Sequence, residues 1–279
     1  MMMKRKYGIP FIAAVRDTDV NTFFRRMPHF RGMGREILKA ASQIVFLSEP
    51  YRDYLVHNHV EEQYKDLVLS KAVVIPSGID DYWFSNKGNS KTLGYRKELK
   101  VLFVGRISKR KNVLRILEAL KILKNRGFDV KFTAVGPIDD EGIHQAILNE
   151  DFSKYVAPVQ KEQLLAIYRK HDIFVMPSLT ETFGLVYPEA MSQGLPVVYT
   201  RGQGFDRQFD DGVVGYSVHA KSADAIAAKI VAIVANYDDT SGRCVALVDK
   251  FRWDRIVKQY ERVYSDILAT VDCGTSRTS

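Results

Sequence analysis

The stretch from Met176 to Val198 constrains the fold of this chain more than any other. It begins at the end of an apolar, β-rich run, HDIFVMPS, and ends in a second such run, LPVVYT. Between the two runs, Pro188 fits the first turn of a compact helix, where its missing N–H costs nothing, and Gly194 ends that helix. The stretch therefore predicts a strand–helix–strand unit of a parallel α/β sheet.

Two glutamates flank the mouth of this predicted helix. Glu181 lies in the loop before it and Glu189 just inside it, with Gly184 between them. A helix N-terminus offers free N–H groups and a partial positive charge, which suit a diphosphate. Carboxylates on either side suit hydroxyl groups, because they would repel more phosphate. The pattern predicts a nucleotide-sugar site, although the helix dipole alone also favours a glutamate in a first turn.

The composition is that of an ordinary soluble globular protein, with 46% hydrophobic and 27% charged residues in 279. No apolar run reaches the length of a membrane span, and Arg16 interrupts the one N-terminal run that resembles a signal peptide. Cys244 and Cys273 are too few for a disulfide framework, which agrees with the reducing cytosol. The net charge of +8 implies an anionic partner such as a nucleotide diphosphate or a lipid headgroup. Nucleic acid is not expected, because the sequence shows no motif for it.

A second loop carries basic residues after the apolar strand VLFV. Gly105 allows a tight turn there, and Arg106 and Lys111 stand five positions apart. Loops at the carboxyl ends of parallel strands are where open α/β sheets bind ligands. An arginine can grip a diphosphate through two hydrogen bonds, and a lysine adds a point charge. The plain alternative is a solvated basic cluster, to which we assign the neighbouring Lys109 and Arg110.

The string E-x-F-G-L-x-x-x-E-A-M, followed by S-x-G-x-P-V-V, closely resembles the E-x7-E motif of retaining glycosyltransferases of the group 1, or family 4, type. G-R-x4-K at Gly105 and KAVVIPSGID resemble two further segments of that family. The resemblance covers nearly the whole chain and is strongest over residues 101–198. It implies an α/β protein of GT-B-like fold, in which two Rossmann-like domains with parallel sheets enclose a cleft.

The resemblance also implies an activity. This is metal-independent transfer of a sugar, with retention of configuration, from a nucleotide diphospho-sugar to a saccharide or lipid-linked acceptor in polysaccharide or glycolipid synthesis. Arg106 and Lys111 would stabilise the leaving diphosphate, and Glu181 would orient the donor sugar. Glu189 would hold the ribose or phosphate end. No cofactor is expected, and the location implied is the cytoplasm, with peripheral attachment to the membrane. The further binding residues implied are Gly105, Val159, Phe183, Gly184 and Leu185.

The N-terminal string R-D-T-D resembles the family's H-G-[ST]-D segment, with Arg16 in place of the histidine. In the family that histidine is thought to lie near the reaction centre, so Arg16 and Asp19 are candidate binding residues. Arginine keeps a hydrogen-bond donor but does not titrate near neutral pH. Pairing of Arg16 with a neighbouring aspartate is an equally open interpretation. The basic, aromatic string FRRMPHFRGMGREILKAA suits an anionic membrane surface, a polyanionic acceptor or a solvated loop.

We expect a partial N-terminal domain over residues 1–96, which ends in the polar linker DYWFSNKGNSKTLGYRKEL, and a nucleotide-sugar-binding domain over 97–250. A helix within 251–279 would cross back to the first domain, with its aromatic stripe in the core. The family's first domain carries further βα units that do not precede Gly8 here, so we expect the first domain to be incomplete. Two alternatives stay open: a non-catalytic donor-binding subunit that needs a partner subunit, and an inactive remnant.

Overall fold

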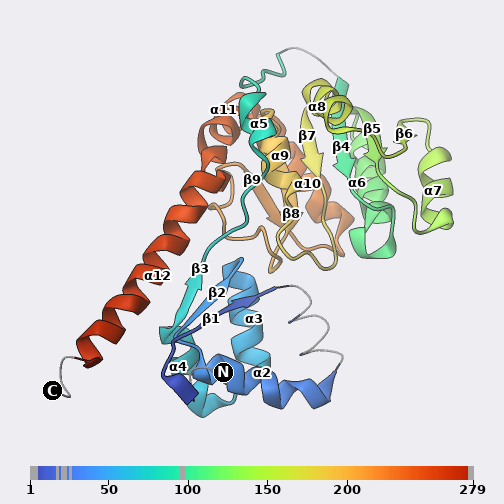
Figure 1. Ribbon diagram of the computed structural model, residues 1–279. Coiled ribbons are helices and arrows are strands. Elements are labelled where there is room, and N and C mark those ends of the chain that lie inside the picture. Colours follow the sequence, from blue (N-terminus) through green and yellow to red (C-terminus); the bar gives the residue numbers. More distant parts are fainter. Residues whose placement is uncertain (1–5, 17–18, 20–23, 25–26, 95–97, 276–279) are drawn as a thin grey trace. The chain divides into compact units, whose positions relative to one another are not determined.

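The computed structural model describes residues 6–16, 19, 24, 27–94 and 98–275. The chain divides into two compact units, Met1–Gly78 together with Trp253–Ser279, and Ile79–Arg252 (Figure 1). Each unit is built on a parallel sheet with helices, which confirms the predicted α/β class with two parallel sheets. Residues 79–96, which the sequence placed with the first domain and its linker, belong to the second unit.

The first unit has a sheet of three parallel strands, in the order β1-β2-β3, among the residues described. Arg25 and Arg26 of the basic and aromatic string lie outside those residues. Among the described residues, none of the helices combines the length and the apolar composition that a membrane span requires. The elements of this unit are β1 (Ile12–Val15), α2 (Pro28–Ala40), β2 (Gln43–Phe46), α3 (Glu49–His59), α4 (Glu62–Ser70), β3 (Ala72–Val74) and α12 (Trp253–Thr275).

Helix α12 packs on the sheet of the first unit, although the chain reaches it only after the whole second unit. Ile256, Val263 and Ile267 join residues of β2 and β3 in one buried cluster. The expectation that the aromatic stripe lies in the core is wrong in part, because Trp253 is 46% and Tyr264 is 56% exposed. Each residue of a helix is rotated by about 100° from the last, so Tyr264, next to Val263, lies at the exposed edge of this buried face.

The second unit has a six-stranded parallel sheet in the order β6-β5-β4-β7-β8-β9. Its strands read as continuous apolar runs because both faces of the sheet are buried. The strands are β4 (Glu98–Val104), β5 (Asp129–Val135), β6 (Ser153–Val156), β7 (Ile173–Val175), β8 (Val197–Thr200) and β9 (Gly215–Val218). The helices are α5 (Asp81–Ser85), α6 (Val113–Asn125), α7 (Glu141–Leu148), α8 (Lys161–Lys170), α9 (Val186–Ser192), α10 (Ala223–Ala235) and α11 (Tyr237–Leu247), with 3-10 turns η2 (Lys109–Lys111) and η3 (Val248–Phe251).

The segment predicted as a polar linker begins with the short helix α5. Asp80 caps this helix, since its Oδ1 accepts a hydrogen bond from the Tyr82 N–H at 2.8 Å. Trp83 and Phe84 on the same turn are buried. Although most of the segment is polar, these two buried aromatic side chains fix its first residues in the second unit.

Candidate functional site

The order of the strands reverses between β4 and β7, which are neighbours at the centre of the second sheet. After β4 the chain moves outward to β5 and β6, and after β7 it moves outward in the opposite direction to β8 and β9. The loops that leave β4 and β7 therefore diverge at the carboxyl edge of the sheet, which is where open α/β sheets bind ligands. These are the loops in which the sequence placed Arg106 and Glu181.

Lys111 and Glu181 form a close ion pair across these two loops. The Lys111 ammonium donates to Oε2 of Glu181, and the two side chains are only 11% and 10% exposed. Ser178 Oγ donates to the same carboxylate oxygen at 3.4 Å. The Lys111 Nζ lies 3.6 Å from the sulfur of Met176. A charge buried this far needs its partner, so each of the two side chains holds the other in place.

The backbone of Glu181 is held from the loop that follows β8. Its N–H donates to Oε1 of Gln203 at 2.8 Å, and its carbonyl accepts from the Gly204 N–H at 2.9 Å. A Cβ at Gly204 would lie 1.8 Å from the carbonyl oxygen of Thr182, so only glycine allows this approach. The local sequence gives no sign of this contact, because it joins side-chain and backbone atoms of two separate loops.

Arg106 is an exposed cation of the site. Its side chain is 62% exposed, and Nη1 lies 3.1 Å from Oδ1 of Asp139, which leaves further N–H groups of the guanidinium directed to solvent. Arg110, which the sequence assigned to the surface, is exposed and also supports the site. Its Nη1 donates to the Thr180 carbonyl at 3.0 Å, one residue before Glu181.

Gly105 and Gly136 let the loops after β4 and β5 approach each other closely. Their φ angles are +155° and +141°, and a Cβ at Gly136 would lie 2.1 Å from the Gly105 carbonyl oxygen. The Gly105 N–H donates to the Val135 carbonyl at 2.9 Å. A side chain at Gly136 would push the two loops apart, so glycine is required at this carboxyl edge.

Asn112 directly follows the basic turn η2. Its φ of +61° is left-handed, a conformation that glycine adopts freely and asparagine tolerates. Its Nδ2 donates to the Pro177 carbonyl at 2.9 Å and to the Ala220 carbonyl at 2.7 Å. Asparagine thus adopts this conformation and makes two hydrogen bonds that tie η2 to the segments after β7 and β9.

Glu189 lies in the first turn of α9 and is largely buried. Tyr168 Oη donates to its Oε2 at 3.3 Å. Burial raises the pKa of Glu189 to about 7, and the hydrogen bond from Tyr168 and the charge of Lys161 oppose this shift only in part. Lys161 is itself paired with Oδ2 of Asp80 at 2.7 Å. Since α9 has only seven residues, the cations matter more to anion binding here than the helix dipole.

The residues between the two glutamates differ in what they can offer a ligand. Phe183 is buried, and its ring packs edge-on against Phe251 at 5.7 Å between centroids. The Phe183 ring is therefore part of the aromatic core of this unit, whereas the sequence motif suggested a binding residue. Gly184 has a φ of +81°, and a Cβ there would lie 2.4 Å from the ring of Tyr187. Leu185 is exposed at the start of α9.

The remaining predicted residues lie elsewhere. Val159 is half-buried in the segment between β6 and α8, which leaves the same carboxyl edge of the second sheet. Arg16 and Asp19 belong to the first unit, where Arg16 is exposed just after β1. The backbone N–H of Arg16 donates to Oδ2 of Asp19 at 2.7 Å. Among the described residues, no group of three or more His, Cys, Asp or Glu side chains is placed to hold a metal ion.

Comparison with known proteins finds a family model that matches more than half of this chain. The sequence model described as glycosyl transferases group 1 matches residues 87–245. The D-inositol 3-phosphate glycosyltransferase of Corynebacterium kroppenstedtii is 26% identical over 95% of this chain and 63% of its own length. The phosphatidyl-myo-inositol mannosyltransferase of Mycobacterium leprae is 32% identical over 71% of this chain and 54% of its own. The chain thus spans about 60% of the length of such relatives.

Solved structures of the same fold include the sucrose-phosphate synthase of Thermosynechococcus elongatus. It superposes with a TM-score of 0.74 at 22% identity and covers 96% of this chain and 70% of that protein. HepE of Anabaena, solved in complex with UDP, superposes with a TM-score of 0.74 at 18% identity. This match covers 95% of this chain and 74% of the HepE chain. Both matches extend over the two units, so the GT-B-like fold expected from the sequence is confirmed.

Proposed function

Because the chain belongs to the group 1 glycosyl transferases, we propose that it transfers a sugar from a nucleotide diphospho-sugar to a saccharide or lipid-linked acceptor. The buried pair of Lys111 and Glu181, with Arg106 on the same loop as Lys111, carries this proposal. It places two cations and one carboxylate at the point where the strand order of the sheet reverses. That combination suits a ligand with a diphosphate at one end and hydroxyl groups at the other.

The transfer breaks the bond between the anomeric carbon and the diphosphate oxygen, and forms a bond from that carbon to the acceptor oxygen. Negative charge grows on the leaving diphosphate, where Arg106 and Lys111 stabilise it. One N–H of the Lys111 ammonium is used by Glu181 and a second contacts the Met176 sulfur, so one remains for the ligand. In our proposal the leaving oxygen takes the acceptor's proton on the same face of the sugar, which retains the anomeric configuration.

In this proposal, Glu181 and Glu189 accept hydrogen bonds from the hydroxyl groups of the donor. Glu181 would accept from the sugar through the carboxylate oxygen that Lys111 does not use. Glu189 would accept from the ribose, and it must be ionised to accept from both hydroxyls. Its pKa of about 7 makes this part of the site sensitive to pH in the neutral range.

UDP is the first nucleotide to test, since HepE, which shares the fold, was solved with UDP. Two relatives are named for inositol-containing acceptors, one of them a phosphatidyl lipid, which supports an acceptor in glycolipid or polysaccharide assembly. Work at the cytoplasmic face of a membrane, without a metal cofactor, is part of the same proposal.

A donor-binding chain without turnover is the second candidate. Arg16 favours it, because this residue stands where the family has a histidine and cannot exchange a proton near neutral pH. In that case the chain would bind the nucleotide-sugar and would need a partner subunit for transfer.

The experiment that separates these candidates measures nucleotide release. The purified chain is incubated with UDP- and GDP-sugars, with and without sugar and lipid-linked acceptors, beside Glu181→Gln. Turnover that falls at least a hundredfold in the variant supports a transferase, and NMR of the product's anomeric proton then tests retention. Binding without turnover supports the second candidate, and absence of both rejects the proposed donor site.

A further inference from the structure

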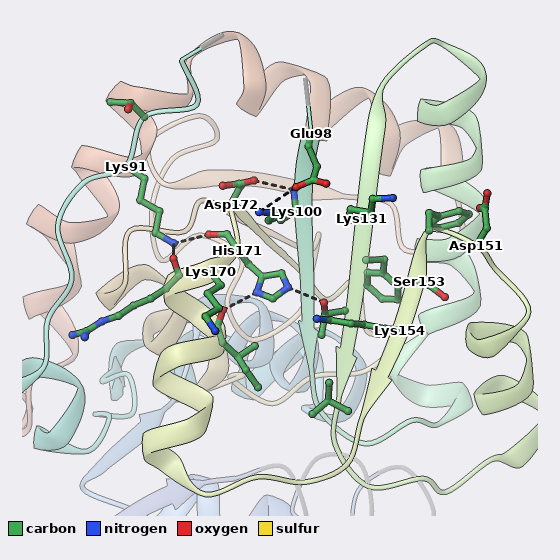
Figure 2. A pocket seen from close by; sticks show the side chains of 17 residues that line it. Lys91, Glu98, Lys100, Lys131, Asp151, Ser153, Lys154, Lys170, His171 and Asp172 are labelled. Carbon is green, nitrogen blue, oxygen red and sulfur yellow. Dashed lines mark hydrogen bonds and ion pairs between the residues drawn. The ribbon is translucent and has the colours of Figure 1, made fainter. Parts of the chain in front are cut away.

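The second unit has a cavity at the opposite edge of its sheet from the candidate site (Figure 2). Its volume is about 870 Å³, and its wall is formed by the first residues of β4, β5 and β6 and by the end of α8. The candidate-site loops leave the other ends of these strands. Since β4 and β5 have seven residues each, the two edges lie roughly 20 Å apart. A ligand in the cavity would therefore not occupy the candidate site.

The cavity wall carries more basic than acidic side chains, and the acidic ones are already engaged. Lys100 Nζ pairs with Glu98 at 3.1 Å, and the Lys100 N–H donates to Oδ2 of Asp172 at 2.8 Å. Asp151 pairs with Lys124, outside the wall, at 2.6 Å. The basic residues of the wall are Lys91, Lys100, Lys131, Lys154, Arg169 and Lys170, and the acidic ones are Glu98, Asp151 and Asp172.

Three lysines from neighbouring strands stand on one face of the sheet. Lys100 of β4 lies directly opposite Lys131 of β5. Lys154 of β6 lies opposite Thr133, which is two positions along from Lys131 and so shares its face. Like charges directly opposite each other destabilise a sheet, and a bound anion would relieve this repulsion. Within the described residues, no ion pair occupies the ammonium groups of Lys131, Lys154 and Lys170.

His171 forms an uncharged part of the wall. Its Nε2 bonds to Thr133 Oγ1 at 2.7 Å and its Nδ1 to the Ile167 carbonyl at 2.7 Å. Burial lowers the pKa of His171 to about 4, and the positive charges of Lys154 and Lys91 add to this shift. The ring is therefore neutral at pH 7, and Figure 2 shows it between the end of α8 and the strands.

Lys91 neutralises the end of α8, which would otherwise repel an anion. Its Nζ donates to the carbonyls of Tyr168 at 3.0 Å, Arg169 at 3.1 Å and His171 at 2.5 Å. Free carbonyls at a helix C-terminus carry partial negative charge. With these groups covered, the wall presents ammonium groups to the cavity and few acceptors.

We propose that this cavity binds a small organic phosphate, with Lys131, Lys154 and Lys170 as its cationic contacts. Ammonium groups on flexible stems suit the dispersed charge of a phosphate better than they suit one flat carboxylate. The volume lies in the range of small-molecule pockets, so it leaves room for an organic group beside the phosphate. This site is independent of the proposed donor site.

Calorimetric titration with inorganic tripolyphosphate tests the proposal. We expect Lys131→Ala/Lys154→Ala to weaken binding at least tenfold. The matched control Lys221→Ala/Lys258→Ala removes the same charge from exposed positions outside the wall and should change the affinity less than twofold. Because its substitutions relieve repulsion, the cavity variant should melt no lower than the wild type, which excludes unfolding as the cause.

Arg106→Ala, which weakens the candidate donor site, should retain tripolyphosphate binding at the cavity within threefold. Loss of binding in this variant but not in the cavity variant would put the anion at the donor site and overturn the proposal. Equal weakening in the cavity and control variants would show a general charge effect and would overturn the proposal. Absence of tripolyphosphate binding by the wild type would overturn it as well. Citrate, a polyanion without phosphate, should bind at least tenfold more weakly, and equal affinity would contradict the ligand class.

Discussion

Lys111 and Glu181, 70 positions apart in the chain, form an ion pair that solvent scarcely reaches. The pair joins the loop after β4 to the loop after β7, and so it brings the two predicted motifs into one site. A buried ion pair contributes little net stability by itself, but loss of one partner leaves an uncompensated charge. The pair therefore couples the integrity of the site to the fold of the second unit.

Lys111→Met should destabilise the protein strongly, because the Glu181 carboxylate stays buried without its cation. Breaking such a pair typically costs about 3–5 kcal/mol. The double variant Lys111→Met/Glu181→Gln removes both charges and should recover most of this loss in chemical denaturation. It should not recover nucleotide binding. A single variant as stable as the wild type would contradict the burial of the pair.

Gln203→Leu should lower activity by loosening the loop that carries Glu181. The substitution keeps a similar size but removes the oxygen that accepts the Glu181 N–H. Loss of this bond should cost about 1 kcal/mol of stability and reduce kcat/KM about tenfold. Gln203→Glu keeps an acceptor oxygen there and should restore most of the melting temperature. If the two variants melt alike, the hydrogen bond does not hold the loop.

Asn112→Ala should destabilise the second unit more than Asn112→Gly. Both variants lose the hydrogen bonds to the Pro177 and Ala220 carbonyls, but only alanine is strained at a φ of +61°. The left-handed conformation costs a residue with a Cβ about 1–2 kcal/mol. Denaturant midpoints measure the difference. Equal loss in the two variants would show that the hydrogen bonds alone matter.

Glu189 should make stability fall as the pH rises from about 4.5 to about 7. The folded pKa is about 7 and the unfolded value is near 4.5, so in this window the folded state holds a proton that the unfolded state releases. His171, with a folded pKa of about 4, contributes the opposite slope, and stability is lost as the pH falls from 6.5. The two slopes largely cancel between pH 4.5 and 6.5 in the wild type.

The difference in unfolding free energy between the wild type and Glu189→Gln isolates the contribution of Glu189 to the pH dependence. Denaturation at several pH values should show the wild type losing stability relative to the variant, by a few kcal/mol across the window. The affinity of the wild type for nucleotide should rise with pH up to about 7, while that of the variant should not change over this range. A pH-independent difference in stability would mean that Glu189 titrates normally.

The local sequence predicted much of the second unit, because its signals are short in range. The apolar runs of β4 and β7, the turn at Gly194 and the order of basic and acidic loops follow from periodicity and turn chemistry. The loops that hold Arg106 and Glu181 leave neighbouring strands of the sheet. That neighbourhood depends on strand order, which the resemblance to a family supplied and local patterns did not.

The features that the sequence did not predict depend on contacts between distant segments. Nothing in the sequence near Glu181 shows that Gln203 accepts its N–H, or that Arg110 supports the preceding carbonyl. Phe183 looked like a binding residue because of its place in the motif, but its ring lies in the aromatic core. Trp83 was hidden in a polar segment. In each case, packing that is not local determines where the side chain lies.

Calorimetric titration of the purified chain with UDP and with GDP tests the central claim most directly, beside the double variant Arg106→Ala/Glu189→Ala. The control is Lys109→Ala, which removes an exposed cation of η2 whose Nζ lies 3.9 Å from Asp140. We predict that the wild type and the control bind one of the two nucleotides with similar affinity, and that the double variant binds at least a hundredfold more weakly. Absence of binding by the wild type, or equal binding by the double variant, would contradict a donor site at this edge of the sheet.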